Sequence, residues 1–331
     1  MHEFMAQLRS LLSGEQSWEH WLSLVSILDH LPEGQKELAA EYVSEHLDDS
    51  WHSQWRLGCG DWSEDSAGWS LVTAESRLLS TLPQAPEIWL PPGTFRMGKS
   101  EGDPDARDSE TPTTEMTLTQ PFWAMLFPVT QRMWDSVFEE NPARFQGLDC
   151  PVENVTWYDA VAFCNALSEQ EGLFTAYELT EEEGEPGSGE YLCNVYWEGH
   201  ESPGYRLPTE VEWEWMCRAG ASVQTSSLEE SAWYQTNSGG ETRRVGQKAP
   251  NAWGLHDTLG NVSEWCYDSW VPALPGDSWE DFVRDGEGQG RILRGGSWFA
   301  DAGQCRVSHR GRAYAGMRSS TFGFRVVRSD V

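Results

Sequence analysis

Nineteen tryptophans in a chain of 331 residues limit the kind of core that this sequence can form. Each indole ring buries a large apolar area, and its N–H group needs a hydrogen-bond acceptor. The sequence also holds 31 glycines, which permit the backbone conformations of irregular loops. Together these residue types predict a core that lies under ordered loops, with indole N–H groups holding the loop backbone in place.

The pattern of apolar residues changes near residue 82. Before this point apolar side chains recur at helical spacing, for example at Trp18, Trp21 and Val25. Four prolines between residues 83 and 92 then interrupt the pattern. Beyond them, short apolar runs alternate with Gly, Pro, Asn and Asp. We therefore expect a small N-terminal helical domain at 1–82 and a larger domain at 86–328.

Charge and hydropathy exclude some classes of partner. The formal net charge of -30 would repel a phosphate backbone, so we expect no nucleic-acid partner. Apolar runs fall short of the roughly 18 residues that a membrane helix needs, and the N-terminus lacks a signal-peptide pattern. We thus expect no membrane partner and a cytoplasmic protein. The seven cysteines show no CxxC spacing and are expected to be reduced thiols.

Three helices are expected in the larger domain. The first follows Thr130 in VTQRMWDSVFEEN, and the third follows Thr209, where Glu212 can complete a capping box. The second, in TWYDAVAFCNALSEQEG, places four apolar residues on one stripe: Ala160, Phe163, Cys164 and Leu167. The acidic, Gly- and Pro-rich stretch at 178–190 is expected to be an exposed excursion.

Eight motifs occur in the order found in one known family. They are FRMG (95–98), PVTQRMW (128–134), NPARF (141–145), PVENVTWYDAVAFCNAL (151–167), YRLPTEVEWEWMCRAG (205–220), PNAWGLHDTLGNVSEW (250–265), RGGSW (294–298) and GFRVV (323–327). Together they resemble the formylglycine-generating enzyme, or sulfatase-modifying factor, domain over about residues 86–328. The resemblance implies an α+β chain with a C-type lectin-like fold, with short twisted strands, few helices and long ordered loops.

The resemblance leaves three kinds of function open. Family members include copper-dependent oxidases that make formylglycine, iron-dependent sulfoxide synthases, and binding proteins such as the variable proteins of diversity-generating retroelements. The oxidases need two thiolates for Cu(I), and here the second falls on Cys305 while the first falls on Ala300. Alanine offers no ligand, so we expect no copper and interpret the chain as non-catalytic. The alternative is a copper or non-haem iron oxidase that uses Cys305 with an unrecognised ligand set.

A calcium site is a further implication of the resemblance. In DTLGNVSE, the carboxylates of Asp257 and Glu264 and the backbone carbonyls of Gly260 and Val262 match a calcium site of the family. Hard oxygen ligands of this kind suit Ca²⁺. The alternative is that the two acidic side chains only cap turns.

The C-terminal segment, residues 299–320, is the expected binding surface. It lies between RGGSW and GFRVV, and its mixed residues lack the alternation of a core strand. In the variable proteins of the family this segment contacts the ligand, which implies a protein or small-molecule partner here. The candidate ligand-binding residues are Phe299, Ala300, Asp301, Gln304, Val307, His309, Arg312, Tyr314, Met317 and Ser319. Five nearby arginines are expected to form scaffold contacts instead: Arg294, Arg306, Arg310, Arg318 and Arg325.

Overall fold

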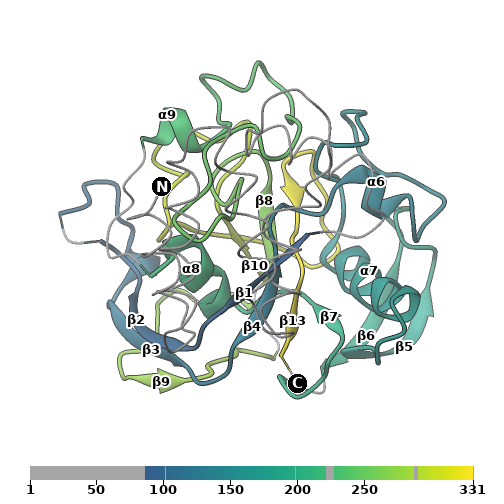
Figure 1. Cartoon of the computed structure of the whole chain (residues 1–331), viewed down its shortest axis with the longest axis horizontal. Helices are drawn as coiled ribbons and strands as arrows, with labels where there is room; N and C mark the ends of the chain where they lie inside the picture. Colours follow the sequence, from purple (N-terminus) through teal and green to yellow (C-terminus); the bar gives the residue numbers. More distant parts are fainter. Residues whose placement is uncertain (1–85, 101, 198, 221–226, 287–289, 331) are drawn as a thin grey trace, which may run out of the picture. The chain divides into compact units, whose positions relative to one another are not determined.

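The computed structural model describes residues 86–330 except 101, 198, 221–226 and 287–289 (Figure 1). The expected helical domain at 1–82 lies outside these residues. Within the described residues, no helix has both the length and the apolar character needed to cross a membrane. The six cysteines in this part of the chain are free thiols, as expected.

Four small sheets make up the strand structure. The first has the order β1 (Glu87–Leu90), β4 (Phe122–Met125), β13 (Val327–Ser329) and β7 (Tyr205–Arg206). The second has the order β11 (Arg310–Ala313), β10 (Arg291–Arg294), β8 (Ser263–Ser269) and β12 (Phe322–Gly323). The third has the order β2 (Gly93–Met97), β3 (Thr114–Leu118) and β9 (Trp279–Glu280), and the fourth is the hairpin β5 (Tyr177–Glu183) and β6 (Leu192–Trp197). Most pairs are antiparallel, which agrees with an α+β chain.

The helices are short, and the four α-helices begin at a capping Thr or Ser in the described part of the chain. They are η1 (Asp108–Glu110), α6 (Gln131–Trp134), α7 (Trp157–Gln170), α8 (Glu210–Arg218) and α9 (Leu228–Ser231). The predicted capping box of α8 is confirmed, because Thr209 accepts from the N–H of Glu212 and the Glu212 side chain accepts from that of Thr209. The predicted stripe on α7 is confirmed as well, since all four of its residues are buried.

The helix predicted after Thr130 is much shorter than expected. Thr130 does cap α6, but the helix ends at Trp134. The indole N–H of Trp134 donates to the carbonyl of Glu140 at 2.7 Å, and this contact draws the following chain back over the ring. The prediction failed because helical spacing in the sequence does not reveal a tertiary hydrogen bond that favours a turn.

The acidic stretch at 178–190 is exposed, as predicted, but it is not an irregular excursion. Its first part continues β5, which pairs with β6 in an antiparallel hairpin. On the inner face, Leu179 and Val195 pack against a cluster that includes Ala162 of α7. Alternate apolar residues therefore specify a strand, although glutamates fill most of the outward positions.

The main core surrounds α7 and is rich in tryptophan. Trp134 stacks on Phe163 of α7 with ring centroids 5.7 Å apart, and both side chains are fully buried. Indole N–H groups donate to backbone carbonyls from five positions: Trp134, Trp157, Trp215, Trp265 and Trp298. The prediction that tryptophans hold loop backbone over the core is thus confirmed.

Candidate functional site

Two glycines after the end of β10 lead into the C-terminal segment. Gly295 and Gly296 have φ of +90° and +76°, in the left-handed region that favours glycine. A Cβ atom at Gly296 would lie 2.6 Å from Sγ of Cys305. The turn therefore brings the backbone directly over the Cys305 thiol, and a larger residue would displace one of the two.

Cys305 and Ala300 follow this turn in the chain, and both are buried. Their exposed fractions are 2% and 8%. Burial raises the pKa of the Cys305 thiol to about 12, so it is almost wholly protonated at neutral pH. Ala300 offers no ligand atom, and Cys305 would have to lose its proton to bind Cu(I).

The reactivity of Cys305 is a direct measure of this environment. We expect iodoacetamide at pH 8 to modify Cys305 at least about 100-fold more slowly in the folded protein than in urea, because the thiolate fraction is so small. Mass spectrometry of the peptide at successive times would measure the rate, with half-buried Cys150 as an internal comparison. Modification of folded Cys305 at the rate of a free thiol would contradict the buried assignment.

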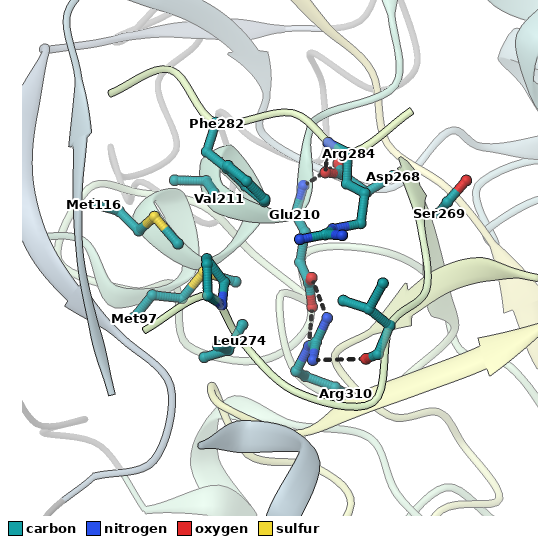
Figure 2. Close-up of a pocket in the computed structure, with 12 residues that line it drawn as sticks. Met97, Met116, Glu210, Val211, Asp268, Ser269, Leu274, Phe282, Arg284 and Arg310 are labelled. Atoms are coloured by element: carbon teal, nitrogen blue, oxygen red, sulfur yellow. Dashed lines mark hydrogen bonds and ion pairs between the residues drawn. The ribbon is translucent and has the colours of Figure 1, made fainter. Parts of the chain in front are cut away.

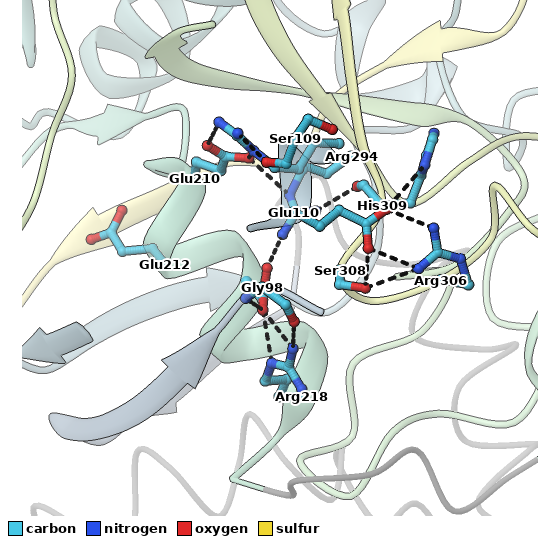
Figure 3. A network of polar contacts seen from close by, with 12 residues as sticks. Gly98, Ser109, Glu110, Glu210, Glu212, Arg218, Arg294, Arg306, Ser308 and His309 are labelled. Carbon is cyan, nitrogen blue, oxygen red and sulfur yellow. Dashed lines mark hydrogen bonds and ion pairs between the residues drawn. The ribbon is translucent and has the colours of Figure 1, made fainter. Parts of the chain in front are cut away.

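Buried ion pairs anchor the C-terminal segment to the rest of the domain (Figure 3). The fully buried carboxylate of Glu110 accepts from Arg306 at 2.6 and 2.9 Å and from the Ser308 hydroxyl at 2.8 Å. A second pair joins Arg310 to Glu210 of α8 through two contacts of 2.7 Å. These bonds connect η1 and α8 to strand β11 and the loop before it, so they fix the course of the segment.

Arg294 lies at the centre of the same network. Its side chain is fully buried and donates to the carboxylate of Glu214 and to the carbonyl of His309. Its guanidinium also lies over the Trp213 ring, 4.9 Å from the centroid. The scaffold role is confirmed for the four buried or partly buried arginines. Exposed Arg318 instead donates a hydrogen bond to the Ser188 carbonyl at 3.2 Å and lies against Gly189.

The candidate binding residues divide into three groups by burial. Ala300 and His309 are buried, and burial with the nearby arginines lowers the pKa of His309 to about 4, so that it is neutral at pH 7. These two side chains therefore do not belong to the exposed face on which they were expected, and their contact with a ligand stays a prediction. Gln304, Val307 and Ser319 are half-buried, and the exposed members are Phe299, Asp301, Arg312, Tyr314 and Met317.

The exposed side chains include three large apolar groups. Phe299, Tyr314 and Met317 are 60%, 68% and 49% exposed. The two ends of the segment lie close together, because the indole of Trp298 donates to the carbonyl of Ser320 at 2.7 Å. The segment thus closes into a loop with apolar side chains on its outside.

Sequence reasoning missed the neighbours of this loop. Phe145 packs edge-on against Trp298 at 5.2 Å, beside Phe299. Leu192 of β6 lies next to Gly316, where an added Cβ would be 3.7 Å from Cδ2 of Leu192. Nothing in the sequence shows that Phe145 lies near Trp298 or that Leu192 lies near Gly316. The one available signal was the position of Leu192 next to an acidic stretch, which indicates an exposed leucine.

The predicted calcium loop is folded around other partners. Glu264 is fully buried, and its two oxygens accept from Arg325 at 2.7 and 2.8 Å and from the Trp213 indole at 2.7 Å. Asp257 accepts from the Gly246 N–H at 2.8 Å. Among the described residues, no group of three or more His, Cys, Asp and Glu side chains is arranged to hold a metal. Since Arg325 already neutralises Glu264, this arrangement does not fit Ca²⁺.

A small pocket lies elsewhere in the domain (Figure 2). Its empty volume is about 270 Å³, including space open to solvent. Met97, Met116 and Phe282 line one side of it, and the Glu210–Arg310 ion pair lines the other. Asp268 lies beside that pair, and burial followed by the nearby charge of Glu210 raises its pKa to about 7. This pocket contains none of the candidate binding residues.

Comparison with known proteins decides the family. Residues 75–330 match the family model described as Sulfatase-modifying factor enzyme 1-like domain. The chain belongs to this family. The Treponema denticola variable protein 1 structure is 30% identical to this sulfatase-modifying factor domain, with a TM-score of 0.63, and the match covers 73% of this chain and 94% of that one.

Two curated relatives of this sulfatase-modifying factor protein cover most of its length. Chaperone protein LppX of Paenibacillus barcinonensis is 34% identical over a 238-residue alignment, and the match covers 63% of this chain and 80% of that protein. Inactive C-alpha-formylglycine-generating enzyme 2 of Mus musculus is 28% identical over 283 residues, covering 73% and 85% of the two chains.

Proposed function

We propose that this protein is a non-catalytic binding module on a C-type lectin-like variant of the sulfatase-modifying factor fold. It binds a protein or small-molecule ligand through the exposed side chains of the C-terminal segment. One observation carries the proposal. Within a single segment, the positions needed for copper chemistry hold an alanine and a buried, protonated thiol, while three large apolar side chains face solvent.

The anchoring network supports binding by a rigid surface. Glu110, Glu210 and Glu214 hold Arg306, Arg310 and Arg294, respectively, so the segment is fixed before a ligand arrives. A surface that is already ordered loses little conformational entropy on association. Exposed aromatic and methionine side chains supply the contact area that binding sites commonly use. The variable protein from Treponema denticola, whose fold is similar, is consistent with this use of the segment.

The surface can be tested with full-length protein. Ligands that the immobilised protein retains from its source cells would be purified, and their dissociation constants measured. The triple variant Phe299→Ser/Tyr314→Ser/Met317→Ser is expected to raise the dissociation constant by at least about 30-fold, because apolar anchors dominate such interfaces. The matched variant Trp279→Ser changes a 43% exposed aromatic residue on β9 and should leave the dissociation constant within about twofold.

A second measurement addresses catalysis in the same protein. Cu(I) titration should give no stoichiometric tight complex, and a cysteine-containing peptide should cause no oxygen uptake. A stoichiometric copper complex with oxygen consumption would overturn the proposal. An unchanged dissociation constant in the triple variant would remove the C-terminal segment from the binding site.

A further inference from the structure

The outward face of the β5–β6 hairpin is a sheet face that no described element covers. Glu178 lies opposite Tyr196, Thr180 opposite Asn194, and Glu183 opposite Leu192, and all six side chains are exposed. We call these six residues the hairpin face. Tyr196 and Leu192 on it are 65% and 46% exposed. The hairpin lies at the outer side of α7, where its inner face joins the core and its outer face meets solvent (Figure 1).

The hairpin face adjoins the C-terminal segment. Leu192 is next to Gly316, and Arg318 donates to the Ser188 carbonyl in the turn between the two strands. Tyr314 and Met317 belong to the turn that flanks Gly316. Apolar side chains of the hairpin and of the C-terminal segment therefore form neighbouring parts of one surface.

The charged side chains of the hairpin itself are all acidic, although Arg318 of the C-terminal segment lies beside its turn. The chain has no lysine or arginine between Phe145 and Tyr205. Six glutamates of the hairpin are exposed: Glu178, Glu181, Glu182, Glu183, Glu185 and Glu190. In the part of the chain that the structure describes, ion pairs are formed by other carboxylates and not by these six. Their charge is thus available to a partner.

These features select one occupant. A second copy of this chain would bring another net charge of -30 and be repelled, as would nucleic acid or an anionic membrane. We propose that the hairpin face binds a Lys- and Arg-rich segment of a partner protein that also carries apolar side chains. Lysine and arginine can pair with Glu178 and Glu183, while their aliphatic stems and the apolar residues pack on Tyr196 and Leu192.

This inference deepens the proposed function, on which it rests, by giving the chemistry of the partner. It adds the hairpin face to the binding surface and predicts that affinity falls with ionic strength. Salt screens the attraction between exposed carboxylates and a cationic partner, and the Debye length is about 8 Å in physiological salt. Apolar contacts with Tyr196 and Leu192 are much less sensitive to salt, so part of the affinity should persist.

The test uses the full chain and two labelled peptides. The probe is a peptide of repeated Lys-Leu-Gly, and its control carries Gln in place of every Lys. Fluorescence anisotropy should show binding of the Lys peptide that weakens with added salt, and much weaker binding of the Gln peptide. Tyr196→Ser/Leu192→Ser should raise the dissociation constant of the Lys peptide about tenfold or more, and Glu178→Gln/Glu183→Gln about threefold to tenfold.

Matched variants separate this surface from the acidity of the whole chain. Leu148→Ser removes another leucine that is 50% exposed, and Glu139→Gln/Glu140→Gln neutralises two exposed glutamates outside the hairpin. Both should leave the dissociation constant within about twofold. Failure of the parent protein to bind the Lys peptide, equal binding of the Gln peptide, or equal weakening by the hairpin and matched variants would each overturn the inference.

The same assay distinguishes the two proposals. Tyr314→Ser/Met317→Ser alters the C-terminal segment without changing the hairpin face. If only this variant weakens peptide binding, the proposed function stands and the hairpin inference fails. If only the hairpin variants weaken it, the hairpin is the binding site and the role proposed for the C-terminal segment fails.

Discussion

Replacing Glu264 with glutamine is expected to lower the free energy of unfolding by about 3–5 kcal/mol, equally with and without calcium. Glu264 and Arg325 are both fully buried and share two hydrogen bonds. A glutamine at position 264 would leave the charge of Arg325 without this counter-ion. Urea denaturation followed by tryptophan fluorescence, in calcium and in EDTA, would measure the loss. The variant keeps the side-chain shape, so the change reports the charge rather than a cavity.

Glu178→Gln is the matched control, because it makes the same chemical change at an exposed position. It should alter the free energy of unfolding by no more than about 0.5 kcal/mol. The contrary result would be that calcium raises the free energy of unfolding of the parent protein but not that of the Glu264→Gln variant. That outcome would make Glu264 a calcium ligand and would require Arg325 to move away from it.

Local signals made the starts of α6 and α8 predictable, although not the length of α6. A capping box needs only a threonine and a suitable side chain three residues later, as at Thr209 and Glu212. Four consecutive residues therefore specify the start of the helix. The stripe on α7 was equally clear because helical spacing and burial agree. In each case the residues that determine the structure are close together in the sequence.

Long-range partners were not predictable from the same sequence. The carboxylate of Glu264 matched a calcium motif in its residue type, but its partner Arg325 lies 61 positions away. Candidate binding residues were chosen by position in the C-terminal segment, and only the fold shows that the His309 side chain is buried, with Nδ1 4.0 Å from the Glu110 carboxylate. Residue type and spacing identified the segment, whereas burial of each side chain depends on strand pairing and on the turn at Gly296.

The acidic hairpin shows how composition can hide a strand. Glutamate has a low strand propensity, and Gly184 and Gly187 lie in the connecting turn, so the stretch had the composition of a loop. Tyr177 and Leu179 on one strand and Cys193 and Val195 on the other supply the alternation that the core requires. The feature that obscured the strand in the sequence is also the one that gives its outer face a strong negative charge.

Replacing Arg294 with methionine is expected to lower the free energy of unfolding by about 3–5 kcal/mol, because it leaves the buried carboxylate of Glu214 short of a partner. The His309 carbonyl would also lose its donor, so amide hydrogen exchange should rise most at the start of β11. Urea denaturation and exchange mass spectrometry would measure both effects. Arg96→Met, at an exposed position on β2, should change stability by less than about 0.5 kcal/mol. An Arg294 variant as stable as the parent, with unchanged exchange at β11, would show that the network does not anchor the C-terminal segment.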